Sequence, residues 1–273
     1  MSAEAPPTDP KRERLHSLSM ELHRSPGRQL EIELQALALS ARTFEVNTVG
    51  LLRAVETFEN AFPNPLLQRG KRDELWEYCF EVVRLFQNAI ASGESFLAHC
   101  RSTVRRRYRK ESFLTEFTEH EKAQIKDSSV CMFVKELRGF LLHKESIKPM
   151  VSRRLIDFSD PMESMCSIVL NTEGIETERN RWKKENPKAL EYLDNLHGSL
   201  NIRRLIYEYR DTVKRFGDWL LNCEKEINAQ ILVAIEPVHA EIDGLLKEIE
   251  TEEVKAMKED AKVYPSWLGS KAD

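Results

Sequence analysis

The chain has 273 residues, of which 41% are hydrophobic and 32% charged, enough to bury a sizeable core and keep a charged surface. Its formal net charge of −4 gives no overall attraction to nucleic acid or to an anionic membrane, so either would need a local basic patch. Five widely spaced cysteines argue against a disulfide framework and a zinc site, and they fit buried thiols in a reducing cytoplasm.

The sequence contains no targeting or membrane signal that we can identify. The N-terminus is polar and rich in proline, and no run of 18 apolar residues occurs. We therefore expect a cytoplasmic protein without membrane contact. The 10 glycines and 11 prolines together fall below the roughly 12% of average proteins, so the elements should be long, and long elements are helices.

The first half of the chain reads as a series of helices. Residues 1–14 are expected to be a disordered tail. The spacing of apolar residues then predicts helices over about 15–23, 30–62, 71–107 and 113–126, with a break at Ser25-Pro26-Gly27 and an end at Pro63. A fifth helix, capped by Asp127 or Ser128, should end before Pro149.

Between about residues 150 and 171 the apolar period changes to that of strands. Two short apolar runs flank Ser159-Asp160-Pro161, which predicts one small β-hairpin. Thr172 then opens a helix to about Lys183. Asn186 caps another helix that has Pro187 at its first position, and Gly198 closes it.

The last element has the clearest periodicity. From Ile202 to Ile227, apolar residues recur in alternating steps of four and three, the seam of a helix packed lengthwise on a partner. The seam continues imperfectly to Ile249, with a kink expected at Pro237. The partner can be the chain's own long helices, which we favour, or a second copy in a coiled coil.

The helix after Ser128 has two different faces. One side of a helical wheel carries Val130, Phe133, Val134, Leu137 and Leu141. Arg138 and His143 flank the opposite side, with Gly139 between them, where a small residue allows another backbone to come close.

Arg138 and His143, in the segment LRGFLLH, form an R-x4-H pattern that resembles the signature of the HEPN (higher eukaryotes and prokaryotes nucleotide-binding) family of helical bundles. The resemblance implies a homodimer in which both residues of each protomer converge and cleave RNA without a metal. His143 would move a proton and Arg138 would hold the phosphate. Active members usually carry a polar residue where this chain has Gly139. In the alternative reading, Arg138 forms an ion pair and His143 complements the helix dipole.

One decapeptide, RSTVRRRYRK, concentrates positive charge. Its candidate nucleic-acid-binding residues are Arg101, Arg105, Arg106, Arg107, Tyr108, Arg109 and Lys110. The cations could grip phosphates while the tyrosine stacks on a base. Alternatively, this segment is the solvated end of a long helix.

No nucleotide-binding loop, nucleophile motif or zinc-binding helix motif is found, so we expect neither a cofactor nor a metal. We predict a mainly α protein: an elongated bundle of long antiparallel helices with one inserted β-hairpin, forming a single domain over residues 15–262, with a flexible tail over 263–273. The favoured function is a non-enzymatic helical interaction or scaffold protein with a protein partner. The alternative is a HEPN-like RNA-binding or RNA-cleaving homodimer.

Overall fold

The computed structural model describes residues 9–61, 65–109, 111–144, 149–153, 166–196 and 199–263. Internal contacts divide the chain into two units. The terminal unit combines Met1–Leu34 with Lys225–Asp273, and the central unit is Gln35–Glu224. The single domain expected over residues 15–262 is thus divided. Tyr264 to Asp273, most of the expected C-terminal tail, lies outside the described residues.

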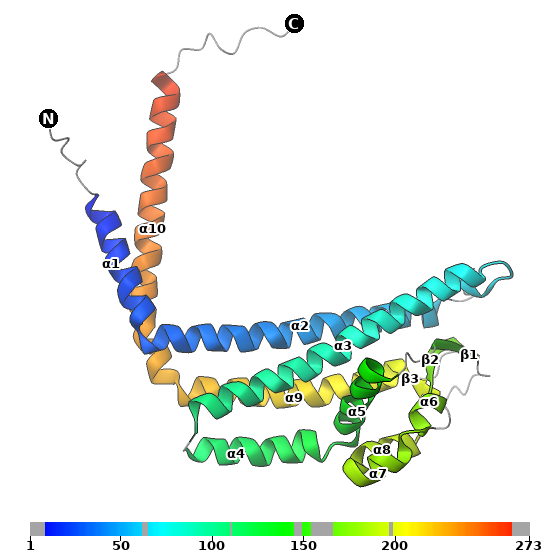
Figure 1. Cartoon of the computed structure of the whole chain (residues 1–273). Coiled ribbons are helices and arrows are strands. Elements are labelled where there is room, and N and C mark those ends of the chain that lie inside the picture. Colours follow the sequence, from blue (N-terminus) through cyan, green and yellow to red (C-terminus); the bar gives the residue numbers. More distant parts are fainter. Residues whose placement is uncertain are drawn as a thin grey trace, which may run out of the picture. The chain divides into compact units, whose positions relative to one another are not determined.

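The mainly α fold with a small sheet is confirmed (Figure 1). The helices are α1 (Pro10–Arg24), α2 (Pro26–Asn60), α3 (Arg72–Arg107), α4 (Ser112–Glu121), α5 (Ser129–His143), α6 (Glu173–Glu176), α7 (Arg179–Glu185), α8 (Pro187–Asp194), α9 (Ile202–Ile227) and α10 (Ala229–Val263). A 3-10 turn, η1 (Pro65–Leu67), precedes α3, and a π-helical turn, η2 (Lys122–Lys126), follows α4. The strands are β1 (Pro149–Arg153), β2 (Cys166–Asn171) and β3 (Ser199–Asn201).

The first helix begins earlier than expected, so disorder up to residue 14 is wrong for residues 10–14. Asp9 accepts a hydrogen bond from the Lys11 backbone N–H at 3.0 Å, and Pro10 occupies the first helical turn, where its missing N–H is not needed. The predicted break follows at Ser25. Its hydroxyl donates to the Leu22 carbonyl at 2.7 Å and accepts from the Arg28 N–H at 3.1 Å, so one side chain ends α1 and begins α2.

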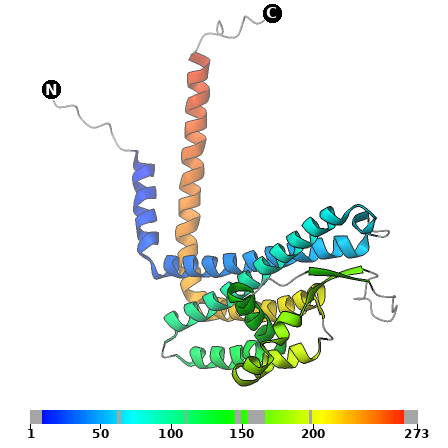
Figure 2. The same ribbon diagram turned by 45° about the vertical axis from the view of Figure 1, so that its right-hand side comes forward.

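Three long helices frame the central unit, and Figures 1 and 2 both show α3 and α9 beside α2. The α2 helix runs antiparallel to α3, because Tyr78 bonds Ala54 whereas His99 bonds Ser40. Gly93 of α3 makes this packing possible. A Cβ there would lie 2.5 Å from the Tyr209 hydroxyl of α9.

Shorter elements complete the core of the central unit. Phe117 of α4 packs on Phe216 of α9 with ring centroids 5.7 Å apart. Phe133 of α5 meets Trp182 of α7 edge-on at 5.9 Å. The predicted helix after Thr172 is split into α6 and α7, while α8 begins at Pro187 as expected. Gly198, expected to close it, lies outside the described residues.

The strands form one antiparallel sheet in the order β1-β2-β3. Val151 pairs with Ile168 and Leu170 with Leu200. The predicted hairpin is confirmed by β1 and β2, although its expected turn at Ser159-Asp160-Pro161 lies outside the described residues. The third strand was not predicted, since three residues carry no readable alternation.

The two parts of the predicted seam have different surroundings. In α9, the seam from Ile202 to Leu220 is fully buried within the chain, which agrees with the favoured intramolecular packing. In α10, the seam residues Ile242, Leu245 and Ile249 are only half-buried. The helix is interrupted at Asn228, which lies between α9 and α10, whereas Pro237, the position of the expected kink, lies inside α10.

Candidate functional site

The outer face of α5 carries the residues of the R-x4-H pattern. Ser128 caps the helix, its hydroxyl accepting from the Cys131 N–H at 3.4 Å. Gly139 is open: nothing lies within 4 Å of where its Cβ would be. Arg138 is half-buried, and His143 is exposed in the last turn. Within the described part of the chain, no hydrogen bond or ion pair joins these two side chains.

Arg138 lies near an unusual carboxylate. Its Nε atom is buried without a hydrogen-bond partner among the described residues. Burial raises the pKa of Glu94 on α3, while the nearby charges of Arg101, Lys135 and Arg138 oppose the rise. The Tyr209 hydroxyl donates to Glu94 at 3.3 Å. Arg138 therefore contributes to a shared electrostatic environment and not to a direct ion pair.

Two residues of the basic decapeptide have a structural role. Tyr108 is only 4% exposed, and its hydroxyl donates to Glu224 Oε2 at 2.9 Å. Arg107 Nη1 lies 2.7 Å from the same oxygen, and its guanidinium carbon lies 5.2 Å from the centroid of the Tyr108 ring. The proposed stacking of Tyr108 on a base is wrong, because the ring already packs on Phe113, 4.9 Å away.

Arg101 also has a partner within the protein. Its Nε donates to the buried carboxylate of Glu121, which additionally pairs with Lys126 at 2.9 Å. Although burial raises the pKa of Glu121, the hydrogen bonds from these two cations leave it below its ordinary value. Arg101 thus holds the end of α4 against α3.

The remaining arginines form a shallow basic surface. Arg105, Arg106 and Arg109 are exposed and line an open depression with Ala98 and Ser102. Lys110 lies outside the described residues. Of the described residues in the decapeptide, these three arginines remain candidates for binding phosphate.

Sequence reasoning missed the buried acids that organise these cations. Glu224 follows Leu220 by four residues and Glu121 follows Phe117 by four, so each lies on the buried stripe of its helix. The sequence did contain a signal for them, namely an acidic residue at a helix position where the spacing predicts a buried apolar one. An acid that is buried in this way is almost always paired with a cation.

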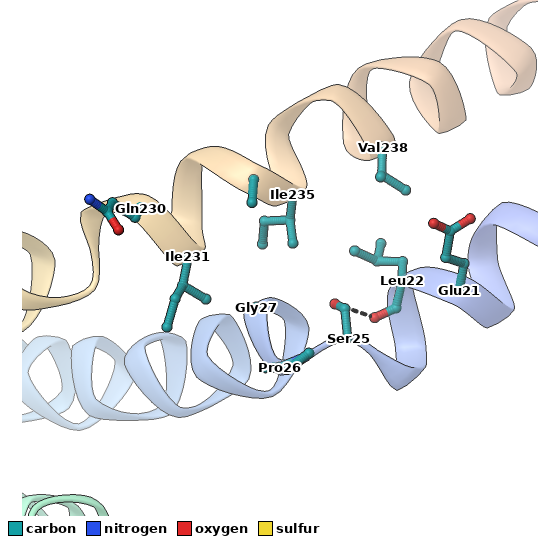
Figure 3. A pocket seen from close by; sticks show the side chains of 10 residues that line it. Glu21, Leu22, Ser25, Pro26, Gly27, Gln230, Ile231, Ile235 and Val238 are labelled. Atoms are coloured by element: carbon teal, nitrogen blue, oxygen red, sulfur yellow. Dashed lines mark hydrogen bonds between the residues drawn. The ribbon is translucent and has the colours of Figure 1, made fainter.

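A second candidate surface lies in the terminal unit, where α1 and α10 pack together. Ion pairs join the two helices, with Arg12 2.5 Å from Glu253 and Arg14 2.8 Å from Glu241. At the other end, Figure 3 shows Leu22 facing Ile235 and Val238 across a groove of about 480 Å³. The groove is lined by Glu21, Leu22, Ser25, Pro26, Gly27, Gln230, Ile231, Ala234, Ile235 and Val238.

Gly27 permits this contact, because a Cβ there would lie 2.4 Å from the Ile235 side chain. Arg28 and His239 both approach Glu31, at 2.7 and 3.1 Å, and tie the start of α2 to α10. The hydrogen bond from Arg28 is the main cause of the lowered pKa of Glu31.

No group of three or more metal-binding side chains occurs among the described residues. Burial raises the pKa of Cys100 and of Cys131 to about 12, so both thiols stay protonated and unreactive. None of the described helices combines the length and apolarity needed to cross a bilayer.

Comparison with known proteins adds no relative: no protein family, no curated protein and no solved structure matches the chain.

Proposed function

We propose that this chain is a non-enzymatic helical interaction protein that binds helical partners through its terminal unit. The main observation in support of this proposal is the contrast between α9 and α10. Both helices have seams of similar spacing, but the α9 seam is buried within the chain from Ile202 to Leu220, while the α10 seam residues Ile242, Leu245 and Ile249 remain half-buried. A half-covered seam is what a helical partner can complete.

The small core of the terminal unit supports the same proposal. Of the side chains described there, the buried large apolar ones are Leu18, Leu22, Leu30 and Ile235. Two paired helices with so few buried side chains gain little from the hydrophobic effect. Their ion pairs are largely exposed and contribute about 0–1 kcal/mol each. Additional burial against a partner would therefore stabilise this unit.

The test selects helical peptides that bind the full chain from a displayed library of amphipathic helices. Leu246 of α10 is 49% exposed, and Leu246→Asp should weaken the selected helices at least about tenfold. Val233→Asp is the matched control, because Val233 is 59% exposed and lies about 140° away around the same helix. Failure to select any helix, or equal binding to both variants, would refute the proposal.

A second candidate is the HEPN-like RNA-binding or RNA-cleaving homodimer. It is supported by the open backbone at Gly139 and by the unsatisfied Nε of Arg138. Purified chain is incubated with RNA in excess EDTA, beside His143→Ala. Cleavage by the wild type alone would support catalysis, and no cleavage, or equal cleavage by both, would remove it.

A further inference from the structure

The part of the basic decapeptide without a structural role lies on one open face at the end of α3. Arg105, Arg106 and Arg109 line the shallow depression in this face. Arg105 and Arg109 are exposed, and neither makes an ion pair with another described residue, including Glu111, the acid nearest in sequence. In a chain with 45 acidic and 41 basic residues, such arginines leave a local excess of positive charge.

The same face continues along α3 to Glu94. Eleven residues complete about three helical turns, so Arg105 lies on the same side of α3 as Glu94, about 16 Å along the helix axis. Arg101, which lies between them, pairs with Glu121, and Glu121 also pairs with Lys126. That buried acid therefore adds no uncompensated negative charge to the face.

Two further cations reach this face from α5, which packs against α3. Burial raises the pKa of Cys131, and the charges of Glu94 and Arg101 modify it further, so the Cys131 side of α5 faces α3. Lys135 and Arg138 follow Cys131 by four and seven residues, on the same side of the helix. Their charges oppose the rise that burial causes in the pKa of Glu94. Lys135 is exposed, and the buried Nε of Arg138 has no hydrogen-bond partner among the described residues.

We propose that Arg105 and Arg109 at the end of α3, together with Lys135 and Arg138 of α5, form one cationic tract that binds the phosphate backbone of a single-stranded nucleic acid. A row of cations suits a linear polyanion, and arginine can pair with a phosphate through two parallel hydrogen bonds. A flexible single strand can follow cations that lie on two helices. Tyr108, the aromatic residue of the decapeptide, is buried and cannot stack on a base, so binding is independent of base sequence.

The cationic tract lies in the central unit, so the inference is independent of the helical partner proposed for the terminal unit. It is also distinct from the RNA-cleaving candidate, because it requires neither a second copy nor His143. His143→Ala should leave the affinity within about a factor of two, since His143 is not among the proposed phosphate contacts.

The test is fluorescence anisotropy of the full chain with a labelled RNA of mixed sequence, at salt concentrations from about 50 to 200 mM. Four phosphate contacts predict a slope of log affinity against log salt of about −3, at about −0.7 per contact for a single strand. The Kd should lie between about 1 and 100 μM near physiological salt. Oligo-U and oligo-A should bind within about a factor of three of each other, because no base is stacked.

Variants of both helices test the extent of the tract. The double variant Arg105→Gln with Arg109→Gln should reduce the slope by about 1.4 and weaken binding about 25-fold at 0.1 M salt, because each contact contributes about fivefold there. Lys135→Gln should reduce the slope by about 0.7 and weaken binding about fivefold. Circular dichroism checks that each variant keeps its helices.

Arg53→Gln is the matched control. Arg53 is exposed and makes no ion pair with another described residue. Its neighbour Ala54 accepts a hydrogen bond from Tyr78, which lies about 40 Å along α3 from Arg105. This variant should change the affinity by less than about twofold, because it removes the same charge outside the tract.

A wild type that does not bind RNA at the lowest salt, or tract variants that bind like the control, would overturn the proposal. A Lys135→Gln variant with wild-type affinity would refute the extension of the tract onto α5. If polyglutamate or vesicles of anionic lipid displace the labelled RNA as well as unlabelled RNA does, the nucleic-acid assignment is wrong. A preference of more than about tenfold for oligo-A would disprove sequence-independent binding.

Discussion

Gly93 and Gly139 form a matched pair for testing the packing of the central unit. Both lie inside helices, so replacing either by alanine gains about 0.8–1 kcal/mol of helix propensity. At Gly139 nothing lies within 4 Å of the new methyl group. At Gly93 the methyl group would lie 2.5 Å from Tyr209 Oη and 2.9 Å from Phe44 Cε2, too close for either ring to remain in place.

The difference between the two variants isolates the packing cost, because the propensity gain is common to both. Overpacking a buried site costs about 1–3 kcal/mol. We therefore expect Gly139→Ala to raise the midpoint of thermal unfolding. The midpoint of Gly93→Ala should lie below that of Gly139→Ala by roughly 2–12 °C, at about 2–4 °C per kcal/mol. Differential scanning calorimetry of the full chain measures both shifts.

A third variant identifies the clashing atom. Tyr209→Phe removes the hydroxyl nearest to Gly93, so its combination with Gly93→Ala should be less destabilising than the sum of the single changes. Equal stabilisation by the two alanines would refute the reasoning, because it would mean that Tyr209 does not pack on Gly93.

Three further outcomes are expected. Arg107→Ala should lower the unfolding free energy in urea by about 3–5 kcal/mol, because it removes the guanidinium that lies 2.7 Å from the buried carboxylate of Glu224, and a loss below about 1 kcal/mol would contradict this. Burial raises the pKa of Glu59 to about 7, although the Arg203 guanidinium 2.8 Å away opposes the rise. The folded state therefore holds a proton that the unfolded state releases, and stability should fall as pH rises from about 4.5 to 7. Glu59→Gln should flatten that pH profile, and an unchanged slope would show that another group is responsible. Cys100 and Cys131 should react with a disulfide reagent only at the rate of unfolding, and fast labelling of either thiol in the folded protein would disprove its burial.

Local periodicity was sufficient to predict most helices. The break at Ser25, the start of α8 at Pro187 and the buried seam of α9 all follow from side-chain spacing and capping chemistry. The early start of α1 was also readable, because Asp9 followed by Pro10 is a helix-start signal.

Other features depend on contacts distant in sequence. Tyr108 was proposed to stack on a base, but its hydroxyl donates a hydrogen bond in the core to Glu224, 116 residues away. The division between the terminal and central units is not visible in the composition of the sequence. Strand β3 forms because its three residues pair with β2, and three residues are too few to show the alternation that predicts a strand. For the R-x4-H residues, the sequence identifies the pair but not its surroundings, such as the buried Glu94, whose raised pKa the charge of Arg138 partly opposes.

The buried Glu224 also limits how α9 can be assembled. A seam that repeats every seven residues looks nearly the same after a slide of one repeat, so apolar contacts alone distinguish poorly between neighbouring alignments. Such a slide would bring Gly217 to the place of Glu224 and leave the Arg107 guanidinium facing a residue without a side chain. A single carboxylate thus distinguishes the observed alignment of these helices from those shifted by one repeat, because the shifted alignments would lose the ion pair.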